Sequence, residues 1–239
     1  YSAENPWHIW IDIVSKFRLI EKRWSTNFEK YVFILANKSK YFEKICKLFF
    51  PDLKFLTVPK NETWRFQHLI VPSMSNYNDG IITPHMPVWI RHLSNLVKKK
   101  DTRPHKKIII TRTDAVNRNV KNQQHMLMAL KGYECVELEK LTIQQQVQTF
   151  AEATHIVSPH GAGLTNLLWC EPNTKVIELT HQSFFSKKVY PVLSHHLGLQ
   201  HSVLLCNTVP IQGPKPKNKK LKDMVDLEID ITKLLENLD

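Results

Sequence analysis

One short segment combines a histidine and two glycines at the junction of two apolar runs. Pro159-His160-Gly161-Ala162-Gly163 follows a strand-like run at 154–157 and opens a helix-like run of leucines. The first backbone N–H groups of a helix and its positive dipole end form an anion site. Glycine lets an anion approach the backbone closely, and His160 can add a donor. The segment is typical either of a phosphate site or of a tight turn with nothing bound.

Two arginines follow a second apolar run. Arg112 and Arg118 lie just after Ile108-Ile109-Ile110 and are six residues apart. Guanidinium groups match the geometry of phosphate, so both arginines could bind one dianionic group. The alternative is that Arg118 pairs locally with Asp114, four residues before it.

A carboxylate lies near the end of a third apolar run. Glu178 lies in the run 176–179, and a carboxylate at the rim of a parallel sheet can accept hydrogen bonds from vicinal hydroxyls, as in ribose recognition. The alternative is a carboxylate that is only solvated.

The elements that must position these residues alternate regularly after residue 107. We predict strands at 108–111, 135–138, 155–158, 176–179 and 202–205, and helices at 121–131, 142–151, from 162, and at 186–197. Such alternation indicates an α/β fold with a parallel sheet and helices on both faces. A loop is expected at 207–222, then an amphipathic helix from about 221, with the acids of 226–230 solvated at its start.

The first hundred residues suggest a second α/β lobe. Asn5-Pro6 is a helix start, and helices are also predicted at 39–49 and 84–97. The compact apolar run 31–36 predicts a buried strand, and further strands are predicted at 53–58 and 66–71. The basic stretch 98–107 is the candidate linker. We therefore expect lobes at 1–100 and 105–210, a C-terminal part at 211–239, and a ligand site in the cleft between the lobes.

The chain is basic, with a formal net charge of +11 over 239 residues. This favours anionic partners, although the runs 98–100, 103–107 and 215–222 are most simply solvated surface. Aromatic residues do not interleave with these runs as a nucleic-acid stacking platform requires, so no nucleic acid is expected. The apolar runs are too short to span a bilayer. We expect a soluble domain, cytoplasmic, or in the lumen of the secretory pathway if an upstream anchor is missing.

Three blocks together resemble glycosyltransferase family 61. They are NPWHIWID near the start, IIITRTDAVNR, and THIVSPHGAGLTNLLWCEPNTKVIEL. That family includes plant xylan arabinosyl- and xylosyltransferases and animal O-linked N-acetylglucosaminyltransferases. The resemblance implies a GT-B fold, with two Rossmann-like lobes facing a central cleft. In one departure, Gln123 stands where the family has Glu.

The resemblance also implies the chemistry. It predicts an inverting transfer of a xylose-, arabinose- or GlcNAc-type sugar from a nucleotide sugar, with UDP the expected nucleotide, to a glycan or glycoprotein hydroxyl. No cofactor and no essential metal are expected. Donor-binding residues by this resemblance and by position are Arg112, Arg118, His160, Gly161, Ala162, Gly163, Thr165, Asn166 and Glu178.

An inverting transfer also needs a general base. His8 and Asp12 are four residues apart on the first helix, hence on one face, and the resemblance maps both onto family positions. We predict Asp12 as base with His8 orienting it or the sugar. The reverse assignment, or a purely structural pair, stays open.

Three other functions remain possible. An inactive sugar- or nucleotide-binding relative would fit the Gln123 departure. A basic nucleic-acid-binding protein would fit the charge alone. A serine hydrolase fits poorly, because the chain has no G-x-S-x-G segment.

Overall fold

The computed structural model describes residues 5–24, 30–35, 39–72, 76–77, 81–112, 117–185, 188–211 and 225–238. The chain divides into two compact units, Tyr1–Val97 and Lys98–Asp239. Each unit is described by itself below. No helix in the described parts of the chain has the length and apolar character needed to cross a membrane.

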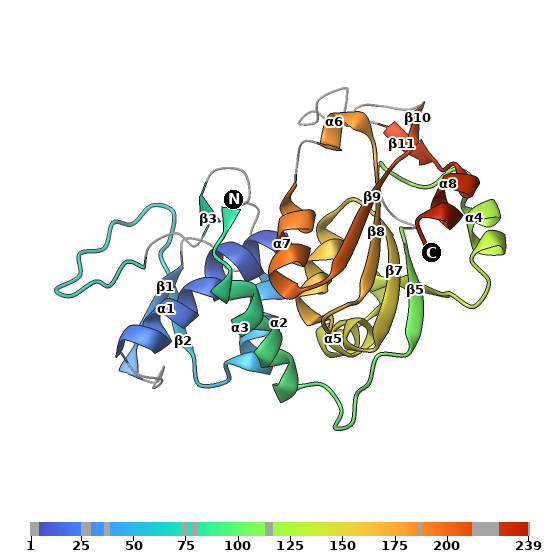
Figure 1. Ribbon diagram of the computed structural model, residues 1–239. Helices are drawn as coiled ribbons and strands as arrows, with labels where there is room; N and C mark the ends of the chain where they lie inside the picture. Colours follow the sequence, from blue (N-terminus) through green and yellow to red (C-terminus); the bar gives the residue numbers. More distant parts are fainter. Residues whose placement is uncertain are drawn as a thin grey trace. The chain divides into compact units, whose positions relative to one another are not determined.

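The second unit is built on a five-stranded parallel sheet (Figure 1). Its strands are β5 (Lys106–Thr111), β6 (Glu134–Glu137), β7 (Ala153–Pro159), β8 (Lys175–Thr180) and β9 (Gln200–Leu205). They lie in the order β6-β5-β7-β8-β9, and every neighbouring pair is parallel. All five predicted strands are therefore confirmed, each within two residues of its expected ends.

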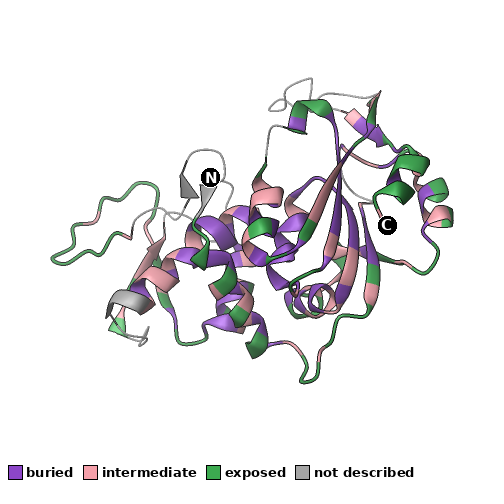
Figure 2. Ribbon diagram, in the orientation of Figure 1, coloured by how far each residue is buried: buried purple, intermediate pink, exposed green. Residues whose placement is uncertain are grey.

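Helices cover both faces of this sheet (Figure 1). The helices are α4 (Gln123–Ala129), the 3₁₀ helix η4 (Leu138–Lys140), α5 (Ile143–Ala151), the 3₁₀ helix η5 (Ala162–Trp169), α6 (Gln182–Phe185), α7 (Val189–Leu197) and α8 (Ile231–Glu236). The helices α4 and α8 cover the face of Ile109, Val157 and Ile177. On the other face, η5 packs against α5 and α7. Within this unit, Figure 2 shows the buried residues concentrated in β5, β7, β8 and the helices around them.

Local sequence signals explain where the helices begin and end. A capping box starts α5, because Thr142 and Gln145 each accept a hydrogen bond from the other's backbone N–H. Left-handed glycines follow the ends of α4 and α7, with φ of 85° at Gly132 and 70° at Gly198. The predicted α/β class is thus confirmed, and the parallel sheet with helices on both faces is compatible with the Rossmann-like lobe of a GT-B fold.

The first unit contains mostly helices and short strands. They are the π-helix η1 (His8–Val14), α1 (Ser15–Trp24), β1 (Val32–Leu35), α2 (Lys40–Phe49), β2 (Lys54–Thr57), β3 (Asn76–Tyr77), β4 (Ile81–Ile82), α3 (His85–Leu93) and the 3₁₀ helix η3 (Ser94–Leu96). The strands β1 and β2 pair in parallel, and β3 pairs with β4 in antiparallel fashion. Its core includes Trp10, Ile11 and Phe17 of the first helical segment.

Two strand predictions in this unit need correction. Strand β1 forms where expected but is not buried, and Val32 keeps 51% of its surface exposed. No strand forms at 66–71, where Leu69 and Val71 are 57% and 77% exposed. Apolar, β-prone residues form a strand only beside a pairing partner and a packing face.

The end of the chain also differs from the prediction. Residues 207–210 were expected in a loop but form β10 (Asn207–Pro210), which pairs antiparallel with β11 (Val225–Glu228). The acids at 226–230 were expected to be solvated at the start of a helix, and this is wrong for Asp226, which is 3% exposed and lies within β11. It is right for Asp230, which is exposed and caps α8 by accepting from the backbone N–H of Lys233 at 3.2 Å. The basic run 215–222 lies outside the described residues.

Candidate functional site

The order of the strands singles out one place at the edge of the sheet. From β5 the chain moves outward to β6, returns to β7 on the other side of β5, and continues to β8 and β9. The direction of winding therefore reverses between β5 and β7. Open α/β sheets bind ligands at such a switch point, outside the carboxyl ends of the strands. Arg112 directly follows β5, and His160 directly follows β7.

Arg112 packs against the turn that follows β7. A Cβ atom added to Gly161 would lie 3.5 Å from Arg112 Nη1. Within the described residues, this Nη1 is buried and has no hydrogen-bond partner. Burial lowers the pKa of Arg112 below its ordinary value, and Glu139, Tyr190 and Asp226 oppose this shift electrostatically. A buried guanidinium nitrogen without an acceptor is costly, and an anion in the turn would satisfy it.

Arg118 also interacts with this group of side chains. Its guanidinium is 5.0 Å from the centre of the Phe184 ring, a cation–π distance. Its backbone adopts the left-handed region, with φ of 62°, and its N–H donates to Val225 O at 2.7 Å. The alternative partner, Asp114, lies outside the described residues, so a pairing of Arg118 with it stays untested.

Aromatic rings surround His160. Its ring centre is 5.2 Å from that of Phe184 and 5.3 Å from that of Tyr190. Burial raises the pKa of Tyr190 far above its ordinary value and Glu178 adds to this, while Arg118, Thr165 and Arg112 act in the opposite direction. Tyr190 is therefore an uncharged phenol within the electrostatic reach of both arginines. Tyr190 and Phe184 were not predicted as site residues, since nothing in their local sequence pattern distinguishes them from core residues.

Glu178 makes contacts other than the predicted one. One carboxylate oxygen hydrogen-bonds His160 Nδ1, and the other lies 3.0 Å from His201 Nε2. Burial raises the pKa of Glu178, but the hydrogen bonds of His160 and His201, together with the charge that each ring carries when protonated, outweigh it, so the pKa is below its ordinary value. Glu178 is 2% exposed. The predicted hydrogen bonds to ligand hydroxyls would have to compete with two histidines.

Helix η5 carries the remaining predicted donor-site residues. Ala162 and Gly163 form its first turn, where the leading backbone N–H groups lack partners within the helix. An added Cβ on Gly163 would approach Leu138 Cδ1 to 2.8 Å, so a side chain at this position requires the end of the Leu138 side chain to move. Asn166 is tied into the fold, because it donates to Gln146 and Gly163 O and accepts from Trp169, all at 3.1 Å. Thr165 is buried beside Tyr190.

The segment that carries Arg118 is clamped by β11, 107 residues further along the chain. Asp226 Oδ1 accepts from the backbone N–H of Asn119 at 2.9 Å and from its side-chain amide at 3.2 Å. The other oxygen, Oδ2, is 2.9 Å from Lys121 Nζ. Leu227 exchanges backbone hydrogen bonds of 2.8 Å with Asn119 and Lys121. The position of Arg118 therefore depends on β11.

Replacing Asp226 with alanine should lower the free energy of unfolding by about 1–3 kcal/mol. The change removes the acceptor of the partly buried backbone N–H of Asn119, and this range is the typical cost of leaving a buried donor unsatisfied. The matched control is Glu228→Ala, which removes an exposed carboxylate from the same strand. Urea denaturation of both variants is the measurement. Equal, small losses in the two proteins would contradict the clamp.

The predicted base pair lies in the first unit. His8 and Asp12 both belong to η1, and His8 Nδ1 is 2.7 Å from Asp12 Oδ2. Asp12 is 7% exposed. The predicted helix start is confirmed, since Asn5 Oδ1 accepts from the N–H of Trp7 at 3.0 Å. A π-helix is uncommon and often occurs at functional sites, but it could not be foreseen from the spacing.

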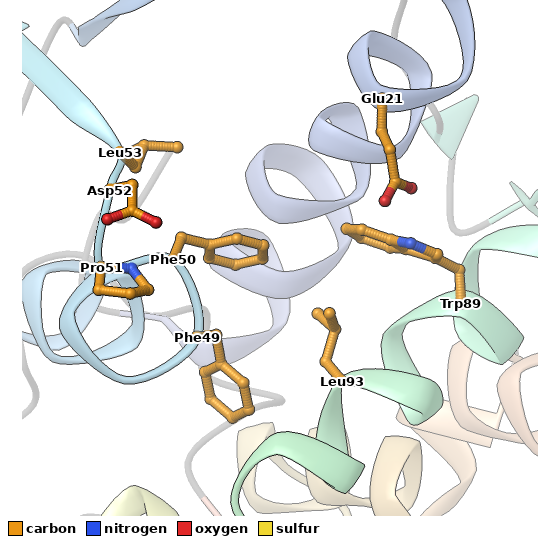
Figure 3. Close-up of a pocket in the computed structure, with 8 residues that line it drawn as sticks. All are labelled: Glu21, Phe49, Phe50, Pro51, Asp52, Leu53, Trp89 and Leu93. Atoms are coloured by element: carbon orange, nitrogen blue, oxygen red, sulfur yellow. The ribbon is translucent and has the colours of Figure 1, made fainter. Parts of the chain in front are cut away.

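The first unit also has a surface hollow of about 210 Å³ between α1, α2 and α3 (Figure 3). Its lining includes the apolar side chains of Trp89, Phe50 and Leu93 and the carboxylates of Asp52 and Glu21. Glu21 already pairs with Arg18 at 2.6 Å. None of the predicted site residues lines this hollow.

The arrangement around the switch point suits an anion. Two guanidinium groups, an imidazole and the start of a helix lie around one buried phenol, and none of these groups repels a phosphate. In the described residues, no group of three or more His, Cys, Asp or Glu side chains is placed to hold a metal ion. The chain itself places two positive groups at this site, the guanidinium groups of Arg112 and Arg118.

Comparison with known proteins gives two findings. A model of the family described as Glycosyltransferase 61 matches residues 7–177. A protein of Oryza sativa subsp. japonica named beta-1,2-xylosyltransferase is 26% identical over 91 residues, which are 38% of this chain and 16% of that protein. The matched part is therefore a small fraction of the rice protein's length.

Proposed function

Because the chain belongs to the glycosyltransferase 61 family, we propose that it transfers a sugar from a nucleotide sugar to a hydroxyl of a glycan or glycoprotein, with inversion and without an essential metal. UDP is the proposed nucleotide, and xylose is the first sugar to test because the rice relative is named a xylosyltransferase. The resemblance drawn from the sequence is confirmed at the level of the family.

The observation that carries the proposal is the position of Arg112 and His160 on either side of the switch point. A nucleoside diphosphate bound there would have its phosphates against the start of η5. The Nη1 atom of Arg112, buried and without a partner among the described residues, would gain an acceptor. Arg118, held beside Phe184, would contribute the second positive charge.

The proposed reaction needs a base that removes the proton of the acceptor hydroxyl. It also needs positive groups that stabilise the charge on the departing diphosphate. Asp12 accepts the proton of the acceptor hydroxyl, and His8, in contact with Asp12, orients it. The hydroxyl oxygen attacks the anomeric carbon as the bond to the diphosphate breaks. Arg112, Arg118 and the dipole of η5 then stabilise the departing diphosphate, which is the usual role of fixed positive groups in such transfers.

Calorimetry with UDP, GDP and CDP in the presence of EDTA tests the donor site. We expect UDP to bind, and binding to persist with the chelator, because the arginines supply the charge. UDP-xylose with a xylan oligosaccharide then tests transfer under the same conditions. Absence of heat with all three nucleotides at millimolar concentration would refute the donor site. Activity that is lost in EDTA and restored by a divalent ion would refute the metal-free mechanism.

A further inference from the structure

A buried chain of polar side chains leads away from His160 through the second unit. Glu178 of β8 links His160 to His201 of β9, and His201 Nδ1 lies 2.7 Å from Ser194 Oγ of α7. The side chains of His160, Glu178 and His201 are 8%, 3% and 4% exposed, and Ser194 is fully buried. A buried polar chain is stable only when its protons are distributed consistently.

With both histidines neutral, the hydrogen bonds allow one such distribution. An ionised carboxylate can only accept, and Glu178 has a pKa below its ordinary value. Both histidines must then donate, His160 from Nδ1 and His201 from Nε2. With its proton on Nε2, a neutral His201 accepts at Nδ1, so Ser194 donates there. Every member of the chain is then satisfied.

We propose that Glu178, His201 and Ser194 form a positioning relay that holds His160 with its proton on Nδ1 and leaves Nε2 for the ligand. The part of this proposal that concerns the ligand rests on the proposed function. In this relay the Glu178 carboxylate accepts from His160 and does not bind the ligand hydroxyls considered earlier. The relay also adds His201 and Ser194 to the site.

The relay also determines what His160 does when a diphosphate binds. Nε2 can donate to a phosphate oxygen only after it takes up a proton from solvent. The Glu178 carboxylate stabilises the resulting imidazolium, as the buried carboxylate does in a serine-protease triad. Arg112 and Arg118 oppose this cation, Tyr190 is an uncharged phenol, and His201 is neutral in the relay. Added negative charge from the ligand therefore favours uptake of the proton.

Two-bond ¹⁵N–¹H correlation spectra of histidine-labelled protein measure these protons directly. In the free protein we expect a proton on Nδ1 of His160 and on Nε2 of His201, with His160→Gln and His201→Gln used for assignment. Addition of UDP should give His160 a second ring proton on Nε2. A free protein with the His160 proton on Nε2, or one whose His160 gains no proton with bound UDP, would overturn the proposal.

The variant Glu178→Gln tests the carboxylate itself. A glutamine has one accepting oxygen and one donating amide, so one of the two histidines must change its tautomer. UDP affinity should fall by about two- to tenfold, the effect of one ordinary hydrogen bond. The control Glu171→Gln removes a carboxylate that pairs with Lys98. It should change neither the histidine tautomers nor the UDP affinity. Unchanged tautomers in Glu178→Gln would overturn the relay.

Failure of the relay and failure of the proposed function are distinguishable. The tautomers of the free protein depend only on the relay, and they are recorded before any nucleotide is added. Wild-type protein that shows the expected tautomers but does not bind UDP would refute the donor site and leave the arrangement of protons intact. If Glu178→Gln does not fold, the wild-type spectrum still decides the tautomer.

Discussion

Replacing Asp12 with asparagine should lower turnover by about 10²–10⁴-fold, the usual contribution of general acid–base catalysis. In the unchanged protein His8 Nδ1 lies 2.7 Å from Asp12 Oδ2. Asparagine keeps the shape of the side chain and can still accept from His8 Nδ1, but it cannot take up a proton. UDP affinity should be nearly unchanged, since the proposed diphosphate contacts all lie in the second unit. Transfer rates at saturating donor and calorimetry with UDP are the measurements.

Two comparisons make this result specific. Asp52→Asn removes an exposed carboxylate from the same unit and should leave turnover unchanged. His8→Ala tests the assignment of roles: if it abolishes turnover while Asp12→Asn stays near wild type, His8 is the base. If both variants unfold, the pair is structural and our mechanism is wrong.

Replacing Arg112 with alanine should weaken UDP binding by about 10- to 150-fold. This corresponds to the roughly 1.5–3 kcal/mol of hydrogen bonds to a charged group. Arg112→Lys should recover only part of the loss, because the planar fork is missing. The free protein should lose little stability, since the change removes a buried Nη1 that has no hydrogen-bond partner in the described structure. Calorimetry and thermal melting of the same samples measure both effects.

A matched control is Arg103→Ala, which removes an exposed arginine from the same unit and should leave UDP affinity unchanged. A variant Arg112→Ala that binds UDP as tightly as wild type would contradict the donor site. A large loss of stability with normal affinity would make Arg112 a structural residue.

The central part of the fold was predictable from local signals. Apolar runs such as Ile108-Ile109-Ile110, the capping residues of α5 and the glycines after α4 and α7 follow short-range rules. The neighbourhood of Arg112 and His160 was also predictable, since both follow strands whose carboxyl ends share one edge of a parallel sheet. This prediction does not depend on how many residues separate Arg112 and His160 in the sequence.

Residues held by distant partners were not predictable in the same way. Glu178 could be assigned a ligand from its place at the sheet rim, but its two histidine partners come from a turn and from another strand. Tyr190 and Phe184 have the pattern of core residues, and only the fold brings their rings to His160. The strand β11 did carry a signal, since residues 225–230 alternate apolar and acidic side chains with the period of a strand.

The clamp on the arginine segment has a consequence for how the protein is made. Asn119 and Asp226 are 107 residues apart, and a ribosome adds about 5–20 residues per second. Arg118 must therefore wait on the order of 5–20 s after its synthesis for the strand that fixes its backbone. During that interval the strands β6 to β9 of the large sheet are synthesised, while the proposed donor site still lacks one arginine in its final position. The site for the donor is thus among the last features of this unit to be completed, and a chain interrupted before residue 225 would contain every predicted donor-site residue without assembling the site.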